Sequence, residues 1–101
     1  MKKNTTRRFT ARSYNDQEFT STAKKIASYL RSLSNRRSSG IVTADDVHTF
    51  LNKEGVRPQQ VRTRLSFINT VLREPMFEQD GTTNSTRPSA KGRAISTWVV
   101  A

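Results

Sequence analysis

The sequence contains no cysteine, which removes several classes of protein at once. Disulfide scaffolds, cysteine-based zinc sites and thiol chemistry are excluded, so the fold must be held by packing alone. Apolar residues are also scarce, at 33% of the 101 residues, and none of them form a run long enough to cross a membrane. We therefore expect one domain with a modest hydrophobic core.

The chain also lacks a recognisable set of catalytic or metal-binding residues. His48 is the single histidine and has no cysteine or second histidine to complete a metal site, so we expect a structural or exposed role. Asp45 and Asp46 fall in the expected first turn of a helix, where acids are favoured by the helix dipole. No glycine-rich phosphate loop is present. We expect no enzymatic activity, cofactor, metal or small-molecule ligand.

Acidic residues are few, and this imbalance is the strongest functional signal. Eight Asp and Glu oppose eighteen Lys and Arg, which gives a formal net charge of +10. Such a charge predicts a polyanionic partner. Nucleic acid is favoured over a membrane surface, because no Lys-rich helix carries a strong apolar face. A ribosomal or merely basic surface remains the alternative.

The first 14 residues read as a flexible basic arm. No acid precedes Asp16, and the arm lacks the apolar stretch of a secretory signal, so we expect a cytoplasmic protein, associated with the nucleoid when bound to DNA. Its basic residues are Lys2, Lys3, Arg7, Arg8 and Arg12.

A first helix is expected from Asn15 to near Asn35. Asn15 can cap it, and Glu18 stands at the position of a capping box. Residues with helical spacing define its inner face: Phe19, Ala23, Ile26, Ala27, Leu30 and Leu33.

A short strand at Ile41-Val42 is expected to lead directly into a second helix. Thr43 and Asp46 form a second capping-box pattern, and Gly55 is a suitable C-terminal stop. The apolar residues Val47, Phe50 and Leu51 are expected to be buried.

A third helix is expected from Pro58 to Arg73, because Pro58 suits a first turn and Pro75 follows the end. Its buried stripe is predicted to be Val61, Leu65, Ile68 and Leu72. Phe67 lies off this stripe, so it is either a second-layer core residue or an exposed contact.

The C-terminal part is predicted to form a hairpin. A strand begins at Met76-Phe77 and gives way at Asp80-Gly81, a turn signal, to a polar loop that continues to Ala90. The segment 93–100 is rich in strand-forming residues and should pair back onto residues 76–78. Trp98 is expected to pack into the core.

This order of elements resembles the winged helix-turn-helix family across residues 15–101. The short turn around Gly55, the small strand before the second helix and the closing strand with Trp98 carry the resemblance. It implies an α+β fold of three helices with a small antiparallel β-hairpin, the wing, whose loop covers about residues 80–93. In this family the third helix enters the major groove of DNA and the wing lies on the backbone or in the minor groove.

Two sets of residues are the expected contacts to double-stranded DNA. Base-reading side chains, chosen for hydrogen bonding to base edges, are Gln59, Gln60, Arg62, Thr63 and Ser66. Phosphate contacts are expected from Arg87, Lys91 and Arg93 of the wing, from Arg36 and Arg37 of the first loop, and from Lys2, Lys3, Arg7 and Arg8 of the arm.

The expected function is that of a DNA-binding transcriptional regulator or accessory factor, similar in its small size to phage or mobile-element proteins. Two alternatives stay open. The third helix could dock on a host protein such as a polymerase or a replication or transcription factor, or the basic surface could bind RNA. A preference for duplex DNA over an RNA hairpin would discriminate between the nucleic acids.

Overall fold

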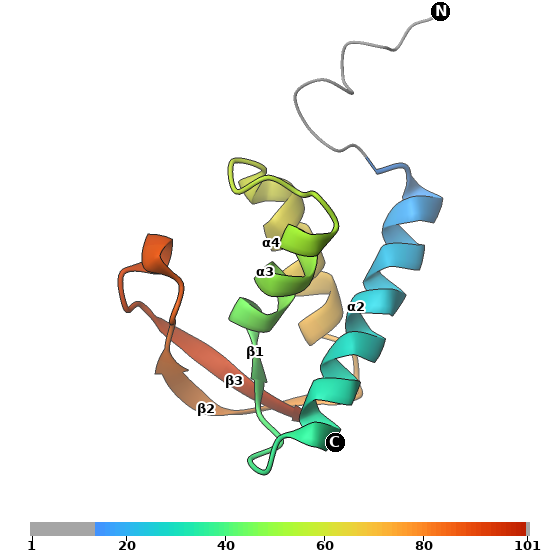
Figure 1. Cartoon of the computed structure of the whole chain (residues 1–101). Helices are drawn as coiled ribbons and strands as arrows, with labels where there is room; N and C mark the ends of the chain where they lie inside the picture. Colours follow the sequence, from blue (N-terminus) through green and yellow to red (C-terminus); the bar gives the residue numbers. More distant parts are fainter. Residues whose placement is uncertain (1–13, 101) are drawn as a thin grey trace, which may run out of the picture.

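The computed structural model describes residues 14–100, so the expected contacts Lys2, Lys3, Arg7 and Arg8 lie outside the described residues. Within 14–100, three α-helices and a three-stranded antiparallel sheet form a small α+β domain, whose layout is compatible with that expected from the sequence (Figure 1). The elements are α2 (Asp16–Arg36), β1 (Val42–Thr43), α3 (Ala44–Lys53), α4 (Val61–Leu72), β2 (Phe77–Asn84), the short 3-10 helix η1 (Pro88–Ala90) and β3 (Ala94–Val100).

The two predicted capping boxes are both present. The Asn15 side chain accepts a hydrogen bond from the Glu18 amide at 2.7 Å and starts α2. Thr43 and Asp46 exchange the same pair of bonds at the start of α3. Each box satisfies amides that would otherwise lack partners in the first turn, so the local sequence sets where each helix begins. Gly55, with φ of 84°, ends α3 as expected.

The helices pack against one another and against one end of the sheet (Figure 1). The strand order is β1-β3-β2, so the closing strand β3 lies in the middle and pairs with both others. Trp98 of β3 is half-buried, packs against the core and pairs with Val42. The largest fully buried side chains come from all three helices, from β1 and from the turn after α3: Ile26, Leu30, Val42, Val47, Leu51, Val56, Phe67 and Val71.

The predicted orientation of the third helix is right only for its C-terminal half, where Leu72 is buried and Ile68 packs against the core. Val61 and Leu65, expected in the core, are 55% and 49% exposed, whereas Phe67 is completely buried. Phe67 stacks on Phe19 at a centroid distance of 4.3 Å and meets Tyr14 edge-on. These ring contacts stabilise the orientation in which Phe67 faces the core.

The start of this helix also differs from the expectation. Pro58 and the glutamines Gln59 and Gln60 lie in the turn before α4, which begins at Val61. The amide of Arg57 donates to the Gln60 side-chain oxygen at 2.8 Å. This hydrogen bond stabilises an irregular turn at residues 57–60. Pro58 had predicted the first turn of the helix at this position.

The wing hairpin is longer than predicted. Asp80-Gly81 does not end the strand, because β2 continues to Asn84 and pairs with β3 down to Ala94. The register shifts between Gln79 and Gly81, so the expected turn is an irregularity of the β-bulge type. The true loop is residues 85–93 and contains η1.

Candidate functional site

The turn between α3 and α4 is held by one buried arginine. Arg64, 5% exposed, donates through Nε to the Arg57 carbonyl at 3.2 Å and through Nη2 to Asn52 Oδ1 at 2.5 Å. Nη2 also donates to the Val56 carbonyl, and Nη1 contacts His48 Nδ1 at 2.8 Å. Because these partners come from α3 and the turn, Arg64 ties the start of α4 to both of them.

His48 is the neutral partner of this arginine. A guanidinium can only donate, so His48 Nδ1 accepts and the ring proton lies on Nε2. Burial, together with the nearby charges of Arg87 and Arg64, lowers the pKa of His48 from 6.5 to about 4. At neutral pH the histidine is therefore an uncharged acceptor, which agrees with the structural role expected from the sequence.

The outward face of α4 carries polar and basic side chains. Arg62 and Ser66, predicted as base readers, are exposed, while Thr63 is half-buried on the flank. Asn69 and Arg73 continue the exposed face towards the end of the helix. Four side chains able to donate hydrogen bonds thus lie along one face.

The two predicted glutamines have different surroundings. Gln59 is exposed in the turn just before α4, whereas Gln60 is partly buried and its side-chain oxygen is occupied by the Arg57 amide. Gln59 is therefore available to an outside partner, and Gln60 is engaged in building the turn. Arg57 is also exposed in this turn.

The wing is attached to α3 through Asp45. One carboxylate oxygen accepts from Ser85 Oγ at 2.7 Å and Arg87 Nε at 2.9 Å, and the other accepts from the Thr86 amide at 2.8 Å. Burial raises the pKa of Asp45, but these hydrogen bonds and the charge of Arg87 outweigh it, so the pKa lies below its ordinary value of 3.8. Arg87, predicted as a phosphate contact, thus forms an ion pair that sets the base of the wing loop.

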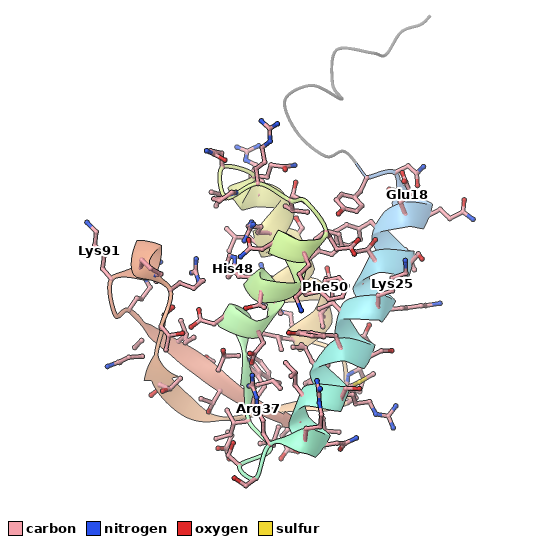
Figure 2. The ribbon with its side chains drawn as sticks, in the orientation of Figure 1. Glu18, Lys25, Arg37, His48, Phe50 and Lys91 are labelled. Carbon is pink, nitrogen blue, oxygen red and sulfur yellow. The ribbon has the colours of Figure 1, made fainter. Side chains whose placement is uncertain are left out.

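Lys91 and Arg93 are the exposed cations of the wing loop. Lys91 has a left-handed backbone, with φ of 51°, and Gly92 follows with φ of 77°. This turn closes the loop after η1, and Figure 2 shows Lys91 at the outer end of the hairpin. Lys91 therefore lies in the turn directly after η1, and Arg93 lies directly before β3.

Arg36 and Arg37 are not brought together with the wing. Arg37 forms a bidentate ion pair with Asp46, at 2.8 and 2.9 Å. Figure 2 shows it near the opposite end of the domain from Lys91, and Arg36 ends α2 beside it. These two residues therefore lie apart from the wing, because the long α2 carries its C-terminal end away from the hairpin tip, and their contact with phosphates stays a prediction.

Two segments of the chain, residues 55–73 and residues 81–100, contain no acidic residue. Residues 55–73, which comprise the turn and α4, contain Arg57, Arg62, Arg64 and Arg73 and no Asp or Glu. Residues 81–100 contain Arg87, Lys91 and Arg93 and again no acid. Each of these two segments therefore carries a net positive charge.

Three contributors were not anticipated from the sequence: Arg64, Asp45 and Asn69. The sequence pattern singled out no role for Arg64, and only its position three residues before Phe67 could have indicated the same buried side. The bonds from Asp45 to the wing span about forty residues, which no local pattern reveals. Asn69 could have been found by extending the polar face one turn beyond Ser66.

Residues 14–100 hold no group of three or more His, Asp or Glu side chains that could bind a metal ion. None of their helices is long and apolar enough to cross a membrane. The fold and the site define a small basic α+β domain that presents cations from one helix, the turn before it and one hairpin. Comparison with protein-family models, with curated proteins and with solved structures found no match to this chain.

Proposed function

We propose that this protein binds double-stranded DNA, with α4 in the major groove and the wing on the phosphate backbone. The observation that carries the proposal is the absence of acids from residues 55–73 and 81–100, which contain the exposed cations Arg57, Arg62, Arg73, Lys91 and Arg93. A groove-binding helix needs exposed donors along one face, and a wing needs cations at its tip. The domain offers both.

The arrangement of elements supports a winged-helix interpretation. A helix, a short strand, two further helices and a hairpin follow one another, and the order β1-β3-β2 places the hairpin beside the short strand. In this interpretation α3 and α4 form the helix-turn-helix, with α4 as the recognition helix. Small size and the concentration of charge favour a transcriptional regulator or accessory factor.

The structure refines which side chains we assign to base contacts. Gln59, Arg62, Ser66 and Asn69 are exposed and belong to α4 or the turn before it. Arg can form two hydrogen bonds with the edge of a guanine, and Gln or Asn can form two with the edge of an adenine. Lys91 and Arg93 are assigned to phosphates.

A titration of labelled duplexes tests the proposal. Wild-type protein is used to select a preferred site from random duplexes, and Arg62→Ala and Asn69→Ala are titrated on selected and random DNA at one salt concentration. We expect Asn69→Ala to weaken binding to the selected site by about 1–3 kcal/mol and to leave random DNA nearly unchanged, because Asn carries no charge. Arg62→Ala should weaken both, and the selected site more.

Thr70→Ala is the matched control, since Thr70 is exposed on the opposite flank of α4. An RNA hairpin serves as competitor, and it should displace the protein less well than duplex DNA. Absence of measurable duplex binding at low salt, or stronger competition by RNA, would contradict the proposal. Equal losses on selected and random DNA would remove direct base readout by α4 and leave a charge-driven binder.

A further inference from the structure

Two large apolar side chains lie exposed on α4, where the function just proposed predicts contact with DNA bases. Val61 is 55% and Leu65 is 49% exposed, and they are the exposed large hydrophobic residues among residues 14–100. They are four residues apart, so they occupy successive turns of the same helix face. Neither belongs to the core, to which α4 contributes Phe67, Val71 and Leu72.

The surroundings of this apolar pair are polar and positively charged. Arg62 follows Val61 directly, Ser66 follows Leu65, and Asn69 lies one turn further along. No acidic residue occurs between 55 and 73 to repel a phosphate backbone. An apolar partner alone would gain nothing from this basic border, whereas the major groove of DNA presents apolar groups between two rows of phosphates.

Resting on the proposed function, we propose that Val61 and Leu65 contact the C5-methyl groups of thymine, so that α4 prefers A·T base pairs. Thymine is the base that presents a methyl group in the major groove, and apolar side chains recognise it there. The adenine of the same pair presents N6 and N7, which match the amide of Asn69 or Gln59. Apolar and amide side chains on one face thus suit the two halves of an A·T pair.

The spacing of the two side chains agrees with this assignment. Four residues of an α-helix advance about 6 Å along its axis. Successive base pairs of DNA are separated by about 3.4 Å, so the pair can reach methyl groups one or two base pairs apart. A short run of A·T pairs is therefore the expected target.

Deoxyuridine provides a direct test, because it pairs like thymidine but lacks the methyl group. The probes are two A·T-rich duplexes of identical sequence, one with thymidine and one with deoxyuridine throughout. The full chain is titrated against both at one salt concentration. We expect the deoxyuridine duplex to bind about fourfold more weakly for each methyl group contacted.

The variant Val61→Ala/Leu65→Ala shows whether this difference arises from the apolar pair. Both residues are exposed, so we expect the variant to fold, which circular dichroism checks. Its affinities for the two duplexes should become nearly equal. The control Thr70→Ala, on the other flank of α4, should retain the wild-type ratio, and this separates the methyl contact from general effects of deoxyuridine on DNA shape.

The outcomes distinguish failure of this inference from failure of the proposed function. Measurable binding with equal affinity for both duplexes by the wild type would overturn the inference and leave DNA binding intact. No binding to either duplex would overturn both. If the wild type sediments as a dimer and the double variant as a monomer, the apolar pair is a contact between copies of this chain and the inference is wrong.

Discussion

The contact between Arg64 and His48 joins a permanently charged side chain to a titratable one inside the helical part of the domain. The guanidinium occupies His48 Nδ1, so protonation of that nitrogen would break the hydrogen bond and place two cations side by side. Arg87 adds further repulsion. The neutral ring is thus part of the structure that holds the turn before α4.

The free energy of unfolding should fall on mild acidification because of His48. The unfolded chain binds this proton near pH 6.5 and the folded chain near pH 4, so protons favour unfolding between those values. The contribution of neutral His48 to the free energy of unfolding is complete above about pH 6.5 and is lost as the pH falls towards 4. We expect a loss of about 1–2 kcal/mol, allowing for the partial exposure of the ring.

Urea unfolding at several pH values, followed by Trp98 fluorescence, measures this loss. His48→Gln retains a side-chain acceptor for Arg64 but does not titrate, so its stability should change less over this interval. The folded pKa of Asp45 lies below its ordinary value, so its stabilisation begins to fall at the acidic end of this interval, and it does so in wild type and His48→Gln alike. The same decline in wild type and His48→Gln would assign the pH dependence to other groups.

At the scale of the element, α4 shows how packing chooses among the faces of a helix. Its sequence offers an aliphatic stripe through Leu65 and an alternative face with Arg64 and Phe67. The domain buries the second face, together with the C-terminal end of the stripe at Ile68 and Leu72. Burial of Arg64 is tolerated because acceptors from α3 and the turn satisfy its guanidinium. Phe67 completes the aromatic cluster with Phe19 and Tyr14.

This orientation predicts that Phe67 and Leu65 respond very differently to truncation. Phe67→Leu should cost about 1–3 kcal/mol, because it leaves a gap and removes ring stacking in a full core. Leu65→Ala should change the free energy of unfolding by no more than about 0.5 kcal/mol, as for other exposed sites. The urea midpoints of the two variants, compared with that of the wild type, measure these two losses. A larger loss for Leu65→Ala would mean that the aliphatic stripe faces the core.

At the scale of the whole molecule, charge is distributed unevenly. Residues 55–73 and 81–100 contain no acid, although Glu78 and Asp80 lie on the wing strand β2, and Arg37 elsewhere in the domain is paired with Asp46. The wing is linked to α3 by the bonds to Asp45, so its tip projects from a fixed base. The proposed DNA binding uses both basic elements, α4 and the wing.

The wing should contribute affinity without sequence preference. Lys91→Ala/Arg93→Ala should weaken binding to all duplexes alike, because phosphate contacts carry no base information. The slope of log K against log salt should become shallower by about 0.9 for each phosphate that the variant no longer neutralises. Titrations at several salt concentrations provide this slope.

The matched control is Lys25→Ala/Arg31→Ala, which removes the same charge from the exposed side of α2. Its slope should stay close to that of the wild type. If both double variants lowered the slope equally, net charge rather than the position of the wing would govern binding.

The sequence by itself determined the features that depend on near neighbours. The capping residues Asn15 and Thr43 set where α2 and α3 begin, and Gly55 ends α3. The α+β composition and the pairing of residues 93–100 with the strand after Met76 followed from residue types and their alternation. The net charge, and the polyanionic partner that it predicts, also needed no structure.

Only the tertiary structure decided what depends on distant partners. The rotation of α4 was set by Phe19 and Tyr14, which lie far away in the chain, and by the acceptors that make the burial of Arg64 possible. A helical wheel cannot predict which face is buried, because the two faces have comparable apolar content and differ only in what packs against them. The same holds for the attachment of the wing to Asp45 and for the exposure of Val61 and Leu65.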